Sequence, residues 1–165
     1  MNTTSLAAAT PIIHFPRNLA PVPAQAESSA GTSLHGLVSG LLQSFLPLTT
    51  LNHTIVLNEI PRDIHLAVDE NMLAFVLWNL LDGAIRSTHN ECIHIEALTV
   101  GDRLTVRIKD VGAYFYHAIS REYRKVQEVA RILGGSISIN SNSGSGTHAT
   151  FSIALPKPAA HHYTP

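Results

Sequence analysis

The chain has 165 residues, of which 45% are hydrophobic and only 14% charged, and its formal net charge is −1. This near-neutral balance gives no electrostatic reason to expect a nucleic-acid or anionic-membrane partner, and the length suits one domain with a core of its own. The single cysteine, Cys92, excludes an intramolecular disulfide and argues against a cysteine-based metal site.

Both ends of the chain differ in composition from its middle. Residues 1–32 are rich in Ala, Pro, Ser and Thr, and such a stretch buries too little apolar surface to offset its ordering entropy. We therefore expect a flexible arm over 1–32, a folded domain over 33–156 and a flexible tail over 157–165. No apolar run reaches the roughly 18 residues of a membrane span, and no basic region followed by an apolar stretch marks a signal peptide. These features predict a cytoplasmic protein.

The first half of the domain alternates helical and extended patterns. Apolar residues recur at helical spacing over 33–48, with Ser33 as a plausible N-cap. An alternating strand follows over 54–60, and a shorter extended segment over 63–68. Asp69 is placed to cap a helix over 70–87.

The second half predicts two hairpins around a helix. Strands over 92–100 and 103–110 meet at Gly101-Asp102, a strong hairpin signal. A helix over 120–133 ends at Gly134-Gly135, a pair suited to a C-cap. Strands over 136–140 and 149–155 then pair across the loop 141–148. This order predicts an α+β domain, a two-layer sandwich with a mixed, mostly antiparallel sheet and about three helices on one face.

The helix over 70–87 contains residues that a core helix does not need. Its stretch "LWNLLDGAIRST" carries Asn79, Asp82 and Gly83 among apolar residues. A glycine inside a helix costs about 1 kcal/mol relative to Ala, and a buried Asn must find hydrogen bonds. Both point to a requirement other than packing.

Three segments together resemble a known family. They are "VDENMLAFVLWNLLDGAIRST", "RLTVRIKDVG" and "ILGGSISINSNSGSGTHATFSIALP". In this order and spacing, residues 33–156 resemble the catalytic ATP-binding domain of sensor histidine kinases, a member of the Bergerat-fold (GHKL) superfamily. The resemblance implies a nucleotide site with ATP or ADP as its ligand.

The resemblance gives the helix residues roles at the phosphates. In the family, two Asn one turn apart face the nucleotide, and the second holds the magnesium ion. Asn79 matches the first, whereas Gly83 stands at the second and has no side-chain oxygen for a hard cation. Asp82 lies about 100° away around the helix and is a poor substitute. Arg86 matches a basic residue that faces the phosphates.

The strand residues would hold the adenine. Asp110 matches the carboxylate that binds the adenine amino group, and Gly112 the glycine that lets the backbone approach the ring. Tyr114 replaces a further glycine and could stack on a base or fill the slot. Thr147 matches a threonine that assists Asp110, with Thr150 as a rival in the same loop-strand unit.

The segment after Gly112 departs furthest from the family, because it has no glycine before Gly134 to cradle phosphates. Arg121, Arg124 and Lys125 could attract phosphate, but solvated charges on a helix face are the simpler interpretation. An aromatic cluster in this region could dock a partner or plug the pocket; it comprises Tyr114, Phe115, Tyr116 and Tyr123. His161 and His162 form an adjacent pair in the predicted tail, and the remaining histidines show no paired spacing for zinc.

Two hypotheses follow. The first is a degenerate, non-catalytic module that binds a signalling protein of a phosphorelay or a related regulatory pathway, because the kinase motifs are incomplete. The second is a nucleotide-binding protein, of the anti-sigma-factor or histidine-kinase type, that uses a remodelled pocket. No catalytic residue is assigned in either case. Asn79, Asp110, Gly112, Thr147 and Arg86 are the candidate nucleotide ligands.

Overall fold

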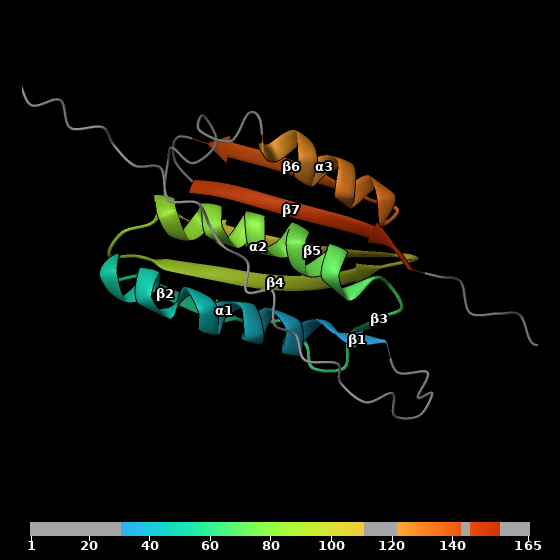
Figure 1. Cartoon of the computed structure of the whole chain (residues 1–165), viewed down its shortest axis with the longest axis horizontal. Coiled ribbons are helices and arrows are strands. Elements are labelled where there is room, and N and C mark those ends of the chain that lie inside the picture. Colours follow the sequence, from blue (N-terminus) through green and yellow to red (C-terminus); the bar gives the residue numbers. More distant parts are fainter. Residues whose placement is uncertain (1–30, 111–121, 143–145, 156–165) are drawn as a thin grey trace, which may run out of the picture.

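The computed structural model describes residues 31–110, 122–142 and 146–155 and arranges them in two layers (Figure 1). Three helices lie on one face of a five-stranded sheet whose strand order is β2-β4-β5-β7-β6. The helices are α1 (Leu34–Leu51), α2 (Glu70–Ser87) and α3 (Glu122–Ile132). The strands are β1 (Thr32–Ser33), β2 (Ile55–Asn58), β3 (His65–Leu66), β4 (Cys92–Val100), β5 (Arg103–Asp110), β6 (Gly135–Asn142) and β7 (Gly146–Ala154).

The main sheet is mixed and mostly antiparallel. β2 runs parallel to β4, while the pairs β4–β5, β5–β7 and β6–β7 are antiparallel. The α+β fold class predicted from the sequence is therefore confirmed. The expected extended segment over 63–68 is reduced to β3, which pairs with β1 in a separate two-stranded sheet.

One hydrophobic core lies between the two layers. Alternate residues of β5 and β7 are buried beneath the helices, and α2 contributes the longest run of buried side chains. Members from every helix and from three strands of the main sheet (β4, β5 and β7) are fully or nearly fully buried, among them Val38, Leu77, Ile95, Val106, Val126, Ala149 and Phe151. Alternation in strands and 3.6-residue periodicity in helices bring these residues to one interface.

The caps of the first two helices agree with the sequence. Ser33 Oγ accepts a hydrogen bond from the Gly36 amide, and Asp69 Oδ1 accepts one from the Met72 amide at 2.8 Å. α2 has the bounds that the sequence predicts. α1 continues through Pro47 to Leu51, three residues beyond the expected end.

Two turns differ from expectation. Gly134 adopts a φ of +76° and ends the α3 segment, but its neighbour Gly135 already belongs to β6. The final hairpin is longer than predicted, since β6 extends to Asn142 and β7 begins at Gly146. Backbone pairing such as Asn142↔Gly146 continues through polar residues for which the sequence predicts a loop.

The predicted arm and tail lie almost wholly outside the described residues, as do Gly112, Tyr114, Phe115, Tyr116 and Arg121. Thr32, which the sequence places in the arm, forms β1 with Ser33. Among the described residues, no helix combines the length and apolar character that a bilayer crossing requires.

Candidate functional site

The outward face of α2 carries the polar residues that the sequence singled out. Phe75, Trp78, Asn79, Asp82 and Arg86 recur at spacings of three and four, so they form one stripe along the helix. Opposite them, α2 packs on the core through residues such as Leu73, Val76, Leu77, Leu80, Leu81 and Ile85. The helix thus buries one face and presents the other.

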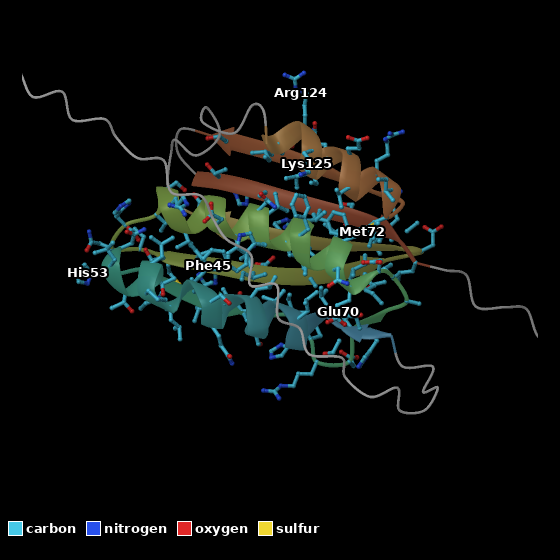
Figure 2. The ribbon with its side chains drawn as sticks, in the orientation of Figure 1. Phe45, His53, Glu70, Met72, Arg124 and Lys125 are labelled. Atoms are coloured by element: carbon cyan, nitrogen blue, oxygen red, sulfur yellow. The ribbon has the colours of Figure 1, made fainter. Side chains whose placement is uncertain are left out.

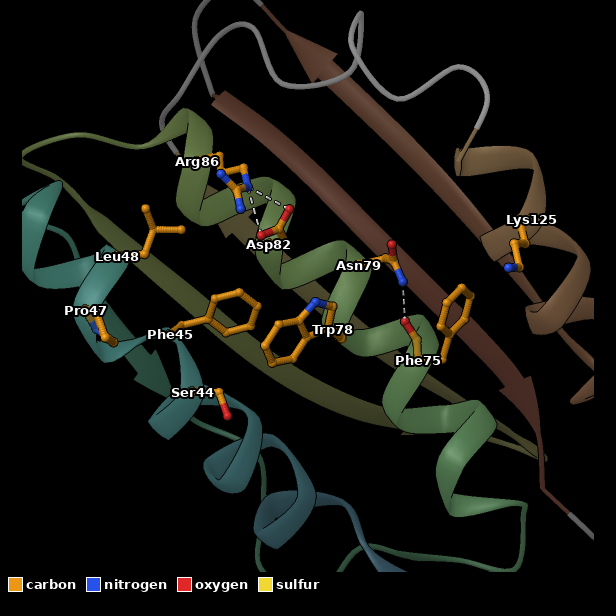
Figure 3. A pocket seen from close by; sticks show the side chains of 10 residues that line it. All are labelled: Ser44, Phe45, Pro47, Leu48, Phe75, Trp78, Asn79, Asp82, Arg86 and Lys125. Carbon is orange, nitrogen blue, oxygen red and sulfur yellow. Dashed lines mark hydrogen bonds and ion pairs between the residues drawn. The ribbon is translucent and has the colours of Figure 1, made fainter. Parts of the chain in front are cut away.

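A groove of about 430 Å³ runs along this stripe (Figure 3). α1 contributes Ser44, Phe45, Pro47 and Leu48, and α3 contributes Lys125. Phe45 and Trp78 pack with ring centroids 4.2 Å apart between α1 and α2. On the other side, the Lys125 ammonium lies 5.8 Å from the centroid of the Phe75 ring. The groove therefore has aromatic walls and a few charged groups, a composition common in ligand and peptide sites.

Asn79 satisfies part of its hydrogen-bonding capacity within its own helix. Its Nδ2 donates to the Phe75 carbonyl at 2.7 Å, one turn back. Figure 3 shows Oδ1 directed away from that bond, on the side of α2 that faces α3. The half-buried amide is thereby held in a fixed orientation along the groove.

Asp82 and Arg86 form an ion pair one turn apart. Arg86 Nε donates to Asp82 Oδ1 at 2.9 Å and to Oδ2 at 2.8 Å (Figure 3). The hydrogen bond that Arg86 donates to Asp82, together with the negative charge of Asp82, raises the pKa of Arg86, against an opposing effect of burial. Arg86 points along its own helix, and its charge is partly neutralised by Asp82.

Gly83 is buried on α2, and its carbonyl accepts a hydrogen bond from Ser87 Oγ at 3.2 Å. It offers no side-chain oxygen, and the nearest acidic residue in sequence, Asp82, is bound to Arg86. Across residues 31–110, 122–142 and 146–155, no three His, Cys, Asp or Glu side chains gather as a metal site. Position 83 of α2 therefore supplies no side-chain oxygen for a hard cation such as magnesium.

A second polar group lies at the end of the sheet. Asp110 on β5 and Thr147 on β7 are direct register partners, and both are almost completely buried. Thr147 Oγ1 donates to Oγ of Ser141, its register partner on β6, at 3.3 Å. The three side chains form a row across three strands on the face that carries the helices.

The rival threonine lies on the opposite face of the sheet. Thr150 pairs with Arg107 on β5 and with Ser138 on β6, one strand pleat out of phase with Thr147. Of the two candidates, only Thr147 shares a sheet face with Asp110. This geometry favours Thr147 as the partner of Asp110 at an adenine, a role that remains a prediction.

Comparison with known proteins was informative only at the level of structure. No family model and no curated protein matches the sequence. The Acinetobacter baumannii histidine kinase AdeS superposes with a TM-score of 0.66 at 19% identity, over 74% of this chain and 65% of that structure. The cytoplasmic segment of histidine kinase QseC gives 0.62 at 17% identity (77% and 78%), and the catalytic domain of histidine kinase ThkA gives 0.60 at 18% (75% and 94%). The chain has the fold of a histidine-kinase catalytic domain.

The histidine-kinase-like fold places the sequence-predicted residues in two groups. Asn79 and Arg86 line the groove on α2, whereas Asp110 and Thr147 lie at the end of the sheet. Gly112, the fifth candidate, lies outside the described residues. The chain spans less than two thirds of the AdeS structure, so the activity of a whole kinase does not transfer with the fold.

Sequence reasoning missed the contribution of α1 to this histidine-kinase-like domain. Phe75 and Trp78 pack against the core, but both are only half-buried and also line the groove. Lys125 also lines the groove, whereas Figure 2 shows Arg124 extending away from the fold. The available signal was the position of Phe75 and Trp78 on the same helical stripe as Asn79.

Tyr123 is the one member of the predicted aromatic cluster that the structure describes. It is half-buried near the start of α3, and burial raises the pKa of its phenol against the effect of a hydrogen bond with Gln127. The question whether the other three aromatics dock a partner or fill the pocket falls outside the described residues.

Proposed function

We propose that this domain is a non-catalytic signalling module that binds a protein partner of a phosphorelay or a related regulatory pathway. The observation that carries the proposal is Gly83, which is buried at the helix position where the resembling family places its magnesium-binding Asn. Phosphoryl transfer in that family depends on a metal that neutralises the phosphates.

The Asp82–Arg86 pair supports the same proposal. A residue that binds phosphate must offer its cationic face to the ligand, and here both carboxylate oxygens of Asp82 engage the Arg86 Nε. A phosphate would have to compete with Asp82 for the charge of this guanidinium, although the Nη groups are not bonded to Asp82. The aromatic-walled groove around the pair is a suitable surface for the side chains of a protein partner, because exposed aromatics are frequent at interfaces.

A second candidate function rests on the buried pair Asp110 and Thr147. A carboxylate and a hydroxyl on neighbouring strands can recognise an adenine edge without magnesium. On that account the domain is a nucleotide sensor that binds ATP and ADP alike. A cytoplasmic location remains our expectation under both proposals, consistent with the likeness to the cytoplasmic segment of QseC.

A calorimetric titration of the full chain with ATP and ADP, with and without magnesium, separates these functions. The proposal expects no heat and no shift in melting temperature at millimolar nucleotide. Micromolar binding that is independent of magnesium supports the nucleotide sensor instead. Magnesium-dependent binding overturns the non-catalytic proposal, because another group must then have taken over the role missing at Gly83.

A further inference from the structure

One edge of the main sheet is long and carries no charge. β6 is the terminal strand, and its eight residues, Gly135–Asn142, read GSISINSN, without a charged residue or a proline. No segment within 31–110, 122–142 or 146–155 pairs with its outer edge, and Figure 1 shows α3 over the face of β6 rather than beside that edge. Natural edge strands are normally blunted by charges, prolines, bulges or short length, because a bare edge recruits another strand.

The opposite edge of the same sheet is protected. β2 has only four residues and is followed at once by Glu59 and then by Pro61. Its last residue, Asn58, is tied to α1 through a hydrogen bond from Nδ2 to Ser39 Oγ at 2.9 Å. The two edges of the sheet therefore differ: β2 is short and tied to α1, whereas the described residues of β6 include no charge and no proline.

The alternation of side chains along β6 places its two isoleucines on one face of the sheet and its polar residues on the other. Ile137 and Ile139 pair with Phe151 and Ala149, so they face the helices and are half-buried. Ser136, Ser138 and Asn140 are exposed on the other face. In an antiparallel pair, directly opposed residues share a face, so an isologous pair must bring residues of equal parity together.

We propose that the outer edge of β6 pairs antiparallel with β6 of a second copy of this chain, joining two sheets across a two-fold axis at Ser138. With Ser138 opposite Ser138 of the second copy, Ile137 faces Ile139 of that copy, and Ile139 faces Ile137. Shifting the axis to Ile137 or Ile139 leaves one isoleucine opposite a glycine or a serine. The axis at Ser138 is thus the register that matches every isoleucine.

The surroundings of the edge favour the same occupant. An uncharged strand meets its own copy without like-charge repulsion, which would oppose self-pairing of most edges. Ile132, at the end of α3 and three residues before β6 begins, has 61% of its surface exposed. A second copy along this edge would cover apolar surface there as well as the open backbone groups of β6.

The proposal can be tested by introducing charged residues at position 138. Sedimentation of the full chain over a range of concentrations then gives the dimer dissociation constant of wild type and of each variant. Wild type is expected to dimerise, whereas Ser138→Glu and Ser138→Lys each place like charges opposite one another at the axis. Each variant alone is expected to raise the dimer dissociation constant roughly tenfold or more, equivalent to about 1.4 kcal/mol. An equimolar mixture of the two variants is expected to restore the dimer, because Glu then faces Lys.

Thr150→Glu is the matched control. Thr150 is the register partner of Ser138 on β7 and shares its sheet face, but it lies one strand inward. In the proposed dimer, its copies are three strand spacings apart, about 14 Å, which exceeds the screening length at physiological salt. We expect Thr150→Glu to dimerise like wild type.

Cross-linking tests the register directly. In a Cys92→Ser background, which removes the only native thiol, Ser138→Cys is expected to form an intermolecular disulfide on mild oxidation. Thr150→Cys is expected to remain unlinked.

Three results would overturn the proposal. The first is a wild type that stays monomeric at high micromolar concentration, as it would if another part of the chain covered the edge. The second is a dimer that the charged variants do not weaken, and the third is cross-linking at position 150 instead of 138. Because none of these measurements involves nucleotide or a protein partner, their failure is distinguishable from failure of the proposed function.

Discussion

At the scale of single residues, we expect position 83 to control whether α2 can hold a magnesium ion. Asn79 and residue 83 lie one turn apart, so an Asn at 83 would add an amide oxygen one turn along from Asn79. We predict that Gly83→Asn gives magnesium-dependent nucleotide binding at least fivefold tighter than wild type, measured by calorimetry with and without magnesium.

Gly83→Ala is the control for this prediction. It changes the helix backbone preference in the same direction, without adding an oxygen, and should leave nucleotide binding unchanged. Melting curves of both variants establish that the buried site tolerates the side chain. A folded Gly83→Asn variant with no gain in affinity would show that the missing oxygen is not what limits binding, and Tyr114 would be the next residue to change.

Glu96 on β4 provides a prediction about pH. Its carboxylate accepts a hydrogen bond from Lys109 and lies 4.0 Å from Arg107 Nη1. The hydrogen bond from Lys109 and the charges around it lower the pKa of Glu96. A carboxyl with a lowered folded-state pKa stabilises the fold above its unfolded pKa of about 4.3, and that stabilisation is lost as the pH falls through the folded value.

Glu96→Gln is therefore expected to lower the melting temperature at pH 7 and to have a diminishing effect as the pH falls below about 4. The loss at pH 7 should stay within about 1 kcal/mol, because the carboxylate is more than one-third exposed to solvent. Melting curves of wild type and variant across pH 2–8 measure it. A difference that persists unchanged at the acid end would contradict the electrostatic origin.

At the scale of elements, alanine substitutions at two glycines are expected to change the stability of the fold in opposite directions. A Cβ on Gly135, at the start of β6, would lie 2.7 Å from the Phe151 ring and 2.7 Å from the Ser152 carbonyl oxygen. A Cβ on Gly40, in the middle of α1, would meet nothing within 4 Å. Gly135→Ala should destabilise the fold by about 1–3 kcal/mol through overpacking, and Gly40→Ala should stabilise it by about 0.5–1 kcal/mol.

Chemical denaturation of the two glycine variants measures both free energies of unfolding. Their opposite signs provide an internal control, because the same substitution is made in both places. A Gly135→Ala variant as stable as wild type would mean that β6 can move away from Phe151. The edge of β6 would then be less rigid than pairing with a second copy in one register requires.

The ends of α1 and α2 are joined by one buried side chain. Asn52, at the C-cap of α1, donates from Nδ2 to the carbonyl of Ile85 at 2.8 Å. Asn52→Ala removes this bond and leaves a buried carbonyl without its donor, so we expect a loss of about 2 kcal/mol in unfolding free energy. Asn71→Ala, at an exposed position near the start of α2, should have little effect or a slight stabilising one. Equal effects of the two substitutions in denaturation would refute the link.

The elements that sequence reasoning located well are those with a local cause. Asp69, the apolar periodicity of 70–87 and the turn at Gly101 act within a few residues, and the structure has α2 and the β4–β5 hairpin at the expected bounds. The misplaced boundaries depend on distant contacts. β3 pairs with β1 more than thirty residues away, and the polar ends of β6 and β7 are held by each other rather than by strand propensity.

The sequence predicted individual residues of the candidate site but not the contacts between them. The pattern of the family indicated Asn79, Arg86, Asp110 and Thr147, but the sequence could not show that Asp82 would engage Arg86. Nor could it show that Phe45 from α1 would complete the wall of the groove beside Trp78. Side-chain pairing between elements depends on how the helices pack, and helical periodicity alone does not specify that packing.

At the scale of the whole molecule, the buried apolar residues form a single cluster that joins the helix layer to the sheet. Most of its described members come from all three helices and from β4, β5 and β7, and the composition of residues 1–32 predicts a flexible arm that adds little to it. We predict a single cooperative unfolding transition for the full chain. A chain shortened to residues 31–155 should melt within a few degrees of it.

Two spectroscopic probes can test whether the helix layer and the sheet unfold together. Trp78 is the only tryptophan, and its ring packs on Phe45 at the junction of α1 and α2, so its fluorescence reports the helix layer. Far-ultraviolet circular dichroism reports the backbone of both layers. Because α2 packs on the same core as β4, β5 and β7, loss of the helix layer should expose the sheet at once. The two urea transitions should therefore coincide, and an earlier transition for Trp78 would mean that α1 and the groove can open while the sheet remains folded.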